Sequence, residues 1–148
     1  MKLRINETLL IGDPNTGAEI EIETKGRIFD IQIINEHLTY NGLNFGERPT
    51  QVNFITTSAD TYKTWEILGT IGIDTGQAGI WSSDASEDST WTELEDGFVS
   101  NLDGEFVDGL VVQAGLGDGE YNVYVKRNEN NEITDFVIDF REEIEIER

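Results

Sequence analysis

The sequence predicts a mainly β fold, an antiparallel β-sandwich or partly open barrel with one short helix near residues 90–96. Hydrophobic and polar residues alternate with a period of two in many short segments, which is typical of half-buried strands. Gly, Asn, Asp and Pro separate these segments at short intervals, as turns between strands require. We therefore expect about eight to ten strands in a single acidic β-rich domain over residues 1–148.

In the first half of the chain, strands are predicted wherever apolar residues alternate with polar or acidic ones. Residues 18–23 alternate small or branched apolar side chains with three glutamates, and residues 29–33 alternate Phe and Ile with Asp and Gln. One face of each segment would enter the core and the other would meet solvent. The same pattern predicts further strands at residues 52–56, 65–67, 71–73 and 78–80.

The last forty residues give the clearest pattern. Residues 110–114 are almost wholly apolar and predict a buried strand, followed by a glycine-rich loop at residues 115–119. A hairpin with an Asn-rich turn then joins two alternating strands at residues 121–125 and 136–140. A final alternation of Ile with Glu at residues 143–147 predicts an edge strand whose charges discourage pairing with other molecules.

One segment departs from the strand pattern. Thr90 and Glu93 have the spacing of a capping box, and a series of apolar residues follows at helical intervals. Gly97 interrupts the series, so we predict only a short helix over residues 90–96. The apolar series consists of Trp91, Leu94, Phe98 and Leu102.

The charge of the chain is extreme and unevenly placed. Thirty acidic residues oppose ten basic ones, giving a formal net charge of −20. Between Lys63 and Lys126 there is no Lys, Arg or His, whereas acids occur throughout that stretch. Direct binding to nucleic acid or to an anionic membrane surface needs a positive footprint and is not expected. A basic protein surface or metal cations would be attracted instead.

Residue types also restrict the chemistry. The chain has no cysteine, which excludes disulfides, thiolate metal sites and cysteine nucleophiles. His37 is the only histidine, and no serine has the setting of a nucleophile elbow, so we expect a binding protein rather than an enzyme. No apolar run has the length of a secretory signal or a membrane span, which favours a cytoplasmic location. No cofactor is predicted.

The clustering of acids predicts an interaction surface. Solubility alone needs a large net charge but not so long a stretch without a base. We therefore expect a small acidic interaction protein, of the immunity or inhibitor type, that binds a basic partner surface through steered association. The residues assigned to this surface are Glu93, Glu95, Asp96, Asp103, Glu105 and Asp108.

Two glycine-rich motifs resemble those of a known family. Residues 71–80 read IGIDTGQAGI, residues 117–125 read GDGEYNVYV, and Asp139-Phe140 follow after the hairpin. Over about residues 70–140 the chain resembles an uncharacterised bacterial domain family with a Val-Asp-Ala/Ser-Gly segment, a Gly-Asp-Gly-x-Tyr strand entry and a closing hairpin. The resemblance implies a continuous structural unit without implying a reaction, and it points to Asp74, Gly76, Asp118, Gly119 and Tyr121.

The same loops supply the alternative functional prediction. Aspartates beside glycines in turns accept backbone hydrogen bonds, so a structural role is the first interpretation. If both loops lie at the same end of the sheet, Asp74 and Asp118, with Tyr121 beside them, would form an acidic pocket. Hard oxygen ligands suit Ca²⁺ or Mg²⁺, and paired carboxylates suit hydrolysis, so this pocket would be a divalent-cation site or a carboxylate-based hydrolytic site.

Overall fold

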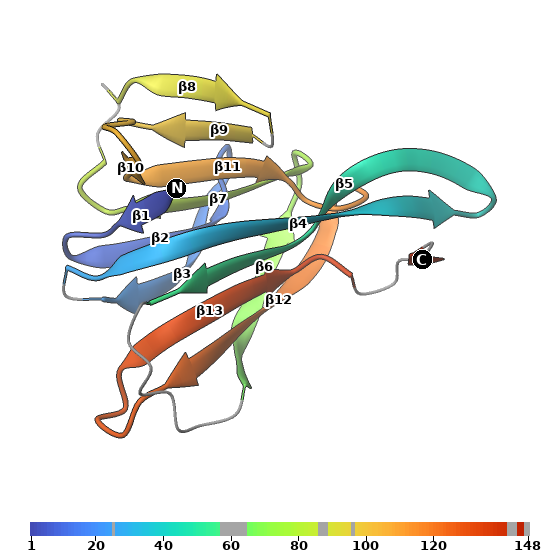
Figure 1. The fold of residues 1–148 in the computed structure, drawn as a ribbon. Helices are drawn as coiled ribbons and strands as arrows, with labels where there is room; N and C mark the ends of the chain where they lie inside the picture. Colours follow the sequence, from blue (N-terminus) through green and yellow to red (C-terminus); the bar gives the residue numbers. More distant parts are fainter. Residues whose placement is uncertain (25, 57–64, 86–88, 96, 142–144, 147–148) are drawn as a thin grey trace.

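Two mainly antiparallel β-sheets form the molecule, as the sequence predicts for its class (Figure 1). The structure is a computed structural model, and it describes residues 1–24, 26–56, 65–85, 89–95, 97–141 and 145–146. These residues contain fourteen strands, more than the predicted eight to ten, because several strands have only two to four residues. In the described part of the chain, neither sheet pairs its last strand with its first.

The larger sheet is antiparallel except at one edge. Its strands follow the order β10-β1-β4-β5-β13-β12-β6, and β14 pairs with β4 beside this path. Only β1 and β10 run parallel to each other. The bounds are β10 (Phe106–Val107), β1 (Lys2–Arg4), β4 (Ile28–Tyr40), β5 (Leu43–Ile55), β13 (Ile133–Asp139), β12 (Gly119–Arg127), β6 (Glu66–Ile73) and β14 (Glu145–Ile146).

The smaller sheet is antiparallel throughout. Its strands follow the order β3-β2-β7-β11-β9-β8, so β3 and β8 are its edges. In Figure 1, β8 and β9 lie at the top of the molecule, beyond β11. The bounds are β3 (Gly17–Glu23), β2 (Thr8–Asp13), β7 (Gln77–Ser82), β11 (Gly109–Gln113), β9 (Gly97–Ser100) and β8 (Trp91–Leu94).

One hydrophobic cluster joins the two sheets. The alternating strands predicted from the sequence supply it, with Ile20 and Ile22 of β3 buried while the intervening glutamates are exposed. At its centre the ring of Phe136 stacks on Phe54 at 4.2 Å and meets Phe29 edge-on at 5.1 Å. Such pairs stabilise a core beyond the area that they bury.

The β4–β5 hairpin extends as an arm beyond the rest of the sheet (Figure 1). Its turn uses Asn41 and Gly42, whose positive φ angles of 52° and 77° fit the tight turn that matches the twist of a hairpin. The base of this arm brings Asn35 and Glu47 close to the end of the smaller sheet.

The predicted short helix at residues 90–96 is wrong. Residues 91–94 form strand β8, which pairs antiparallel with β9, and the described residues contain no α-helix, hence none able to cross a membrane. Thr90 makes hydrogen bonds to Asn101 across the hairpin instead of capping a helix. Trp91 and Leu94 lie on opposite faces of the strand, because β pairing with a distant segment outweighs the local helical spacing.

Replacing Phe136 with alanine is expected to lower the free energy of unfolding by roughly 3–5 kcal/mol, because it leaves a cavity beneath two aromatic rings. Urea denaturation followed by tryptophan fluorescence measures the loss. Ile55→Ala, at a side chain 42% exposed, is the control and should cost less than about 1 kcal/mol. Equal losses in the two variants would contradict the placement of the core.

Candidate functional site

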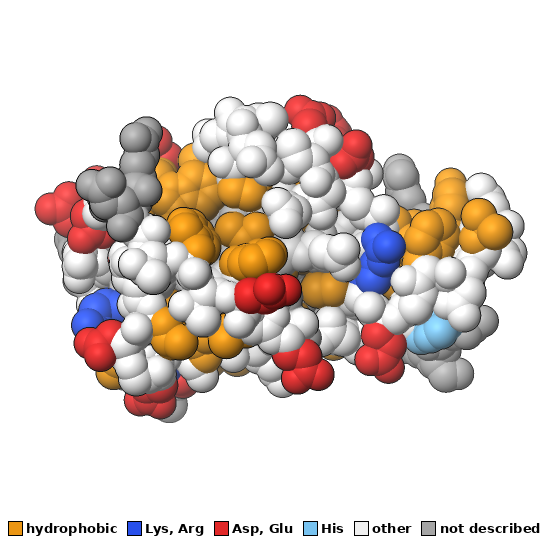
Figure 2. All heavy atoms as spheres, turned by 90° about the horizontal axis from the view of Figure 1, so that it is seen from above, with side chains coloured by type: hydrophobic (Ala, Val, Ile, Leu, Met, Phe, Trp, Pro, Cys, Tyr) orange, Lys and Arg blue, Asp and Glu red, His pale blue; other side chains and the backbone are white. Residues whose placement is uncertain are grey.

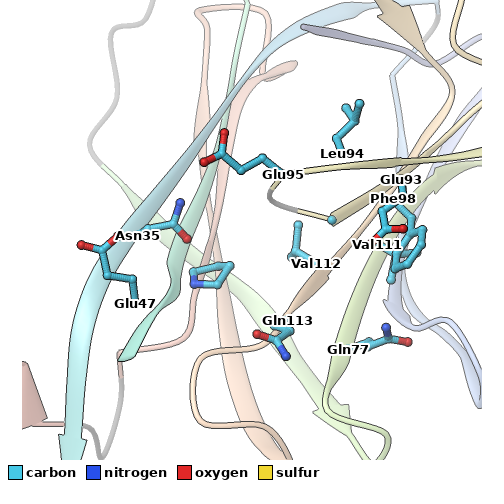
Figure 3. Close-up of a pocket in the computed structure, with 12 residues that line it drawn as sticks. Asn35, Glu47, Gln77, Glu93, Leu94, Glu95, Phe98, Val111, Val112 and Gln113 are labelled. Atoms are coloured by element: carbon cyan, nitrogen blue, oxygen red, sulfur yellow. The ribbon is translucent and has the colours of Figure 1, made fainter. Parts of the chain in front are cut away.

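A cleft opens where the β8–β9 hairpin approaches the base of the β4–β5 arm. Its cavity volume is about 450 Å³. Figure 3 shows Asn35 and Glu47 on one side of it, Glu93 and Phe98 on the other, and Glu95 between them. We call it the acidic cleft, lined by Asn35, Glu47, Pro49, Gln77, Glu93, Leu94, Glu95, Gly97, Phe98, Val111, Val112 and Gln113.

The elements that form this cleft come from both sheets. Strand β9 pairs with β11 only as far as Phe98 opposite Val111, so β11 runs on past the end of the hairpin. Gly97 allows this close approach, because a Cβ there would lie 2.2 Å from the Val111 carbonyl oxygen. Gln113 therefore remains exposed at the surface of the cleft, whereas Val112 is buried beneath it.

An apolar hollow continues from the cleft into the space between the sheets. We call it the inner hollow; it has a volume of about 120 Å³ and shares Leu94, Glu95 and Gly97 with the acidic cleft. Leu94 is 37% exposed at its mouth. Its other lining residues are Met1, Ile33, Val99 and Leu110.

The charge of the acidic cleft is of one sign. Glu47, Glu93 and Glu95 are exposed, and none of the residues that line the cleft is basic. Hydrophobic side chains gather on the face seen from above, with acidic side chains among and around them (Figure 2). Phe98, which is 39% exposed, lies opposite Glu93 in the β8–β9 pairing. The site thus combines carboxylates for a cation with an apolar floor for an anchor.

The basic side chains that the structure describes are engaged elsewhere. Arg48 lies between two residues of the cleft, yet its guanidinium donates to the Gly115 carbonyl oxygen at 3.3 Å. Arg4 stacks over the Phe106 ring at 4.1 Å. The other contacts are Lys2 with Asp30 and Glu105, Arg27 with Glu132, Lys126 over Trp65, Arg127 with Glu66, and Arg141 with Asp139.

Two of the six acids predicted as a binding surface line the acidic cleft. Glu93 and Glu95 line the acidic cleft, while Asp96 lies outside the described residues. Asp103 and Glu105 lie in the loop between β9 and β10, where the Glu105 carboxylate is 3.9 Å from an ammonium group. That ion pair lowers the net charge of the predicted surface at its far end.

Asp108 has a structural role instead of an open surface position. Its carboxylate accepts hydrogen bonds from the Asn101 side-chain amide at 2.6 Å and from the Ser100 hydroxyl. Asn101 has a positive φ of 51°, so this carboxylate fixes the turn that follows β9. These bonds stabilise the β8–β9 hairpin, which forms one wall of the cleft, at the end that lies away from the cleft.

The two loops that contain Asp74 and Asp118 lie together, as a shared pocket would require. Gly119 pairs with Ile73 between β12 and β6, and the Ala114 N-H donates to the Gly76 carbonyl oxygen at 3.0 Å. Asp74 and Asp118 at this end are both exposed. Among the described residues, no group of three or more His, Cys, Asp or Glu side chains is arranged to hold a metal ion.

Tyr121, predicted as part of that pocket, belongs to the core. It is 5% exposed and meets the Phe140 ring edge-on at 5.1 Å. Its hydroxyl donates to the Gly117 carbonyl oxygen at 2.7 Å and lies 3.2 Å from that of Ala114. The tyrosine therefore ties the glycine-rich loop to the body of the protein.

The residue that organises these loops was not predicted from the sequence. Asp13, at the end of β2, has no exposed surface, and its carboxylate accepts backbone hydrogen bonds from Asn15, Asp74 and Thr75 at 2.7–2.9 Å. Burial alone would raise the pKa of Asp13, but these bonds and that from the Thr75 hydroxyl outweigh it and hold the pKa below its ordinary value of 3.8. Asp13 thus locks the β2–β3 turn to the β6–β7 turn.

A second hollow lies over the outer face of the larger sheet. Its volume is about 440 Å³, and Trp65 and Tyr124 supply its aromatic lining. Its charges already neutralise each other, because Arg141 binds both carboxylate oxygens of Asp139 at 3.0 Å. The acidic cleft is the more specific site, since its lining carries charge of one sign.

Comparisons with protein-family models, with curated proteins and with solved structures found no match. The resemblance to an uncharacterised bacterial family therefore stays a prediction.

Replacing Asp13 with asparagine is expected to lower the free energy of unfolding at pH 7 by about 2 kcal/mol, because partly buried N-H groups lose a charged acceptor. The folded-state pKa is depressed, so this contribution is complete above the unfolded value of 3.8 and disappears as pH falls through the folded value. The difference between wild type and Asp13→Asn should therefore shrink as the pH falls below 3.8.

Urea denaturation at several pH values measures this difference. Asp118→Asn, at an exposed carboxylate in the adjoining loop, is the matched control and should leave stability almost unchanged. A loss in Asp13→Asn that stays the same from neutral to acidic pH would contradict the carboxylate's role.

Proposed function

We propose that this protein is an acidic interaction module of the immunity or inhibitor type, a β-sandwich that covers a basic segment of a partner protein. The segment binds in the acidic cleft. Its Lys or Arg side chains meet Glu47, Glu93 and Glu95, and an apolar side chain beside them enters the inner hollow.

One observation carries this proposal: acids of both sheets surround an apolar opening, and no base lies among the lining residues. An acidic surface alone would serve solubility, and an apolar opening alone would suit many ligands. Their combination selects a partner that presents positive charge next to a hydrophobic side chain.

The expected contributions to the binding free energy assign different roles to the inner hollow and to the carboxylates of the acidic cleft. Burying an apolar side chain of the size of Val or Leu contributes roughly 1.5–3 kcal/mol. An exposed Glu–Lys pair contributes only about 0.2–1 kcal/mol and is screened by salt. The inner hollow should therefore supply a large part of the affinity, whereas the carboxylates guide association and select the sign of the partner's charge.

Replacing Glu47, Glu93 and Glu95 together with glutamine should weaken binding of a Lys-rich, Val-containing peptide about tenfold at low salt, because three pairs of modest strength are lost. Isothermal titration calorimetry at two salt concentrations measures the effect. The wild-type affinity should fall steeply with salt, while that of the triple variant should change little.

The control carries the same change in net charge away from the cleft. Glu21, Glu120 and Glu129 are exposed carboxylates on β3, on β12 and in the β12–β13 turn, and their replacement with glutamine should leave binding close to wild type. Equal weakening in both triple variants would show that net charge alone governs binding, against the proposed site.

A further inference from the structure

The edge of the smaller sheet next to the cleft is open. Strand β8 pairs with β9 on one side, and no strand in the described part of the chain pairs with its other side (Figure 1). The acidic cleft and the inner hollow both begin at the end of this strand, at Leu94 and Glu95.

The register shows which backbone groups of β8 face outward. The Asn101 N-H donates to the Thr90 carbonyl oxygen at 2.8 Å, and this pair continues the register in which Trp91 lies opposite Ser100. Hydrogen-bonded and non-hydrogen-bonded pairs alternate along an antiparallel ladder. The N-H and C=O groups of Trp91 and Glu93 therefore point away from β9, toward the open edge.

The opposite edge of the molecule is closed. There β3 and β6, edge strands of the two sheets, lie against each other, and the Glu19 carboxylate accepts a hydrogen bond from the Gly72 N-H at 2.6 Å. A Cβ on Gly69 would lie 3.3 Å from the Ile20 side chain. This contact between β3 and β6 blocks strand addition. The two edges therefore differ in whether their main-chain groups are open to an added strand.

We propose that the basic segment of the partner binds as an extended β-strand added to β8, with its main chain bonded to Trp91 and Glu93. This inference rests on the proposed function and adds the conformation of the bound segment. Strand addition supplies affinity through main-chain bonds, while alternate side chains supply specificity.

The faces of β8 define the sequence pattern of the added strand. Trp91 and Glu93 project from the outer face, opposite Ser100 and Phe98, whereas Leu94 lies on the inner face and lines the inner hollow. Residues of the partner that lie beside Glu93 are therefore Lys or Arg, and those between them are apolar and reach the inner hollow. The segment alternates basic and apolar residues.

Charge also excludes a second copy of this chain as the occupant. Two β8 strands side by side would bring Glu93 and Glu95 of one molecule onto the same edge as those of the other. Like charges facing each other across strands are destabilising, whereas a basic segment removes this repulsion.

Two variants of one residue separate main-chain bonding from charge. Glu93→Gln removes the carboxylate and keeps the backbone N-H, whereas Glu93→Pro removes both. Proline should not disrupt the β8–β9 pairing, because the Glu93 N-H does not bond to β9 and proline is tolerated at sheet edges. Glu93→Pro should bind an alternating Lys-Val peptide about tenfold more weakly than Glu93→Gln, which corresponds to one hydrogen bond. Equal affinities of the two variants, with unchanged thermal unfolding, would overturn strand addition.

A second experiment leaves the protein unchanged. Two eight-residue peptides of identical composition are compared by calorimetry, one alternating Lys and Val, the other with four Lys followed by four Val. The alternating peptide should bind at least about tenfold more tightly, and N-methylation of one alternate set of its amides should abolish binding while methylation of the other set does not.

The outcomes distinguish the two proposals. Equal binding of the two peptides, or indifference to N-methylation, would overturn strand addition while leaving capture of a basic segment in the cleft intact. Failure of both peptides to bind at low salt would overturn the proposed function itself and the strand proposal with it.

Discussion

The main-chain groups of an edge strand need partners, and the two ends of this molecule meet that requirement in different ways. At one end Glu19 accepts a hydrogen bond from the Gly72 N-H, and the buried Asp13 carboxylate holds two neighbouring turns together. At the other end β8 leaves the outward groups of Trp91 and Glu93 facing away from the sheet. Unsatisfied edges invite pairing with another chain, so the open edge determines where a partner can add to the protein.

Because of this arrangement, the negative charge of the protein favours binding of a partner at one site. The chain has a net charge of −20, yet several of its acids have structural roles or ion pairs, as Asp108, Glu105 and Glu66 show. The acidic cleft differs because its carboxylates surround an apolar opening, and because nearby Arg48 is turned to a backbone carbonyl instead. The same net charge would not select one kind of partner if it were spread over a uniformly polar surface.

The sequence predicted the strands well because alternation reports directly which face of a strand is buried. It failed at residues 90–96, where local helical spacing competes with pairing to β9, and only the tertiary partner decides. Glu93 and Glu95, two of the acids predicted for the binding surface, both line the acidic cleft. Glu47 joins them through the packing of the β4–β5 arm, which no local pattern encodes. No local pattern predicts the role of Asp13, since its partners Asp74 and Thr75 are about sixty positions away.

Amide hydrogen exchange followed by NMR can detect a strand added to β8 at single residues. With the alternating Lys-Val peptide at saturation, exchange of the Trp91 and Glu93 amides should slow strongly, since both acquire hydrogen-bond acceptors. The Thr92 amide, which faces β9, should change much less. Saturated binding that leaves the Trp91 and Glu93 amides exchanging at their free rates would show that the peptide does not pair with β8.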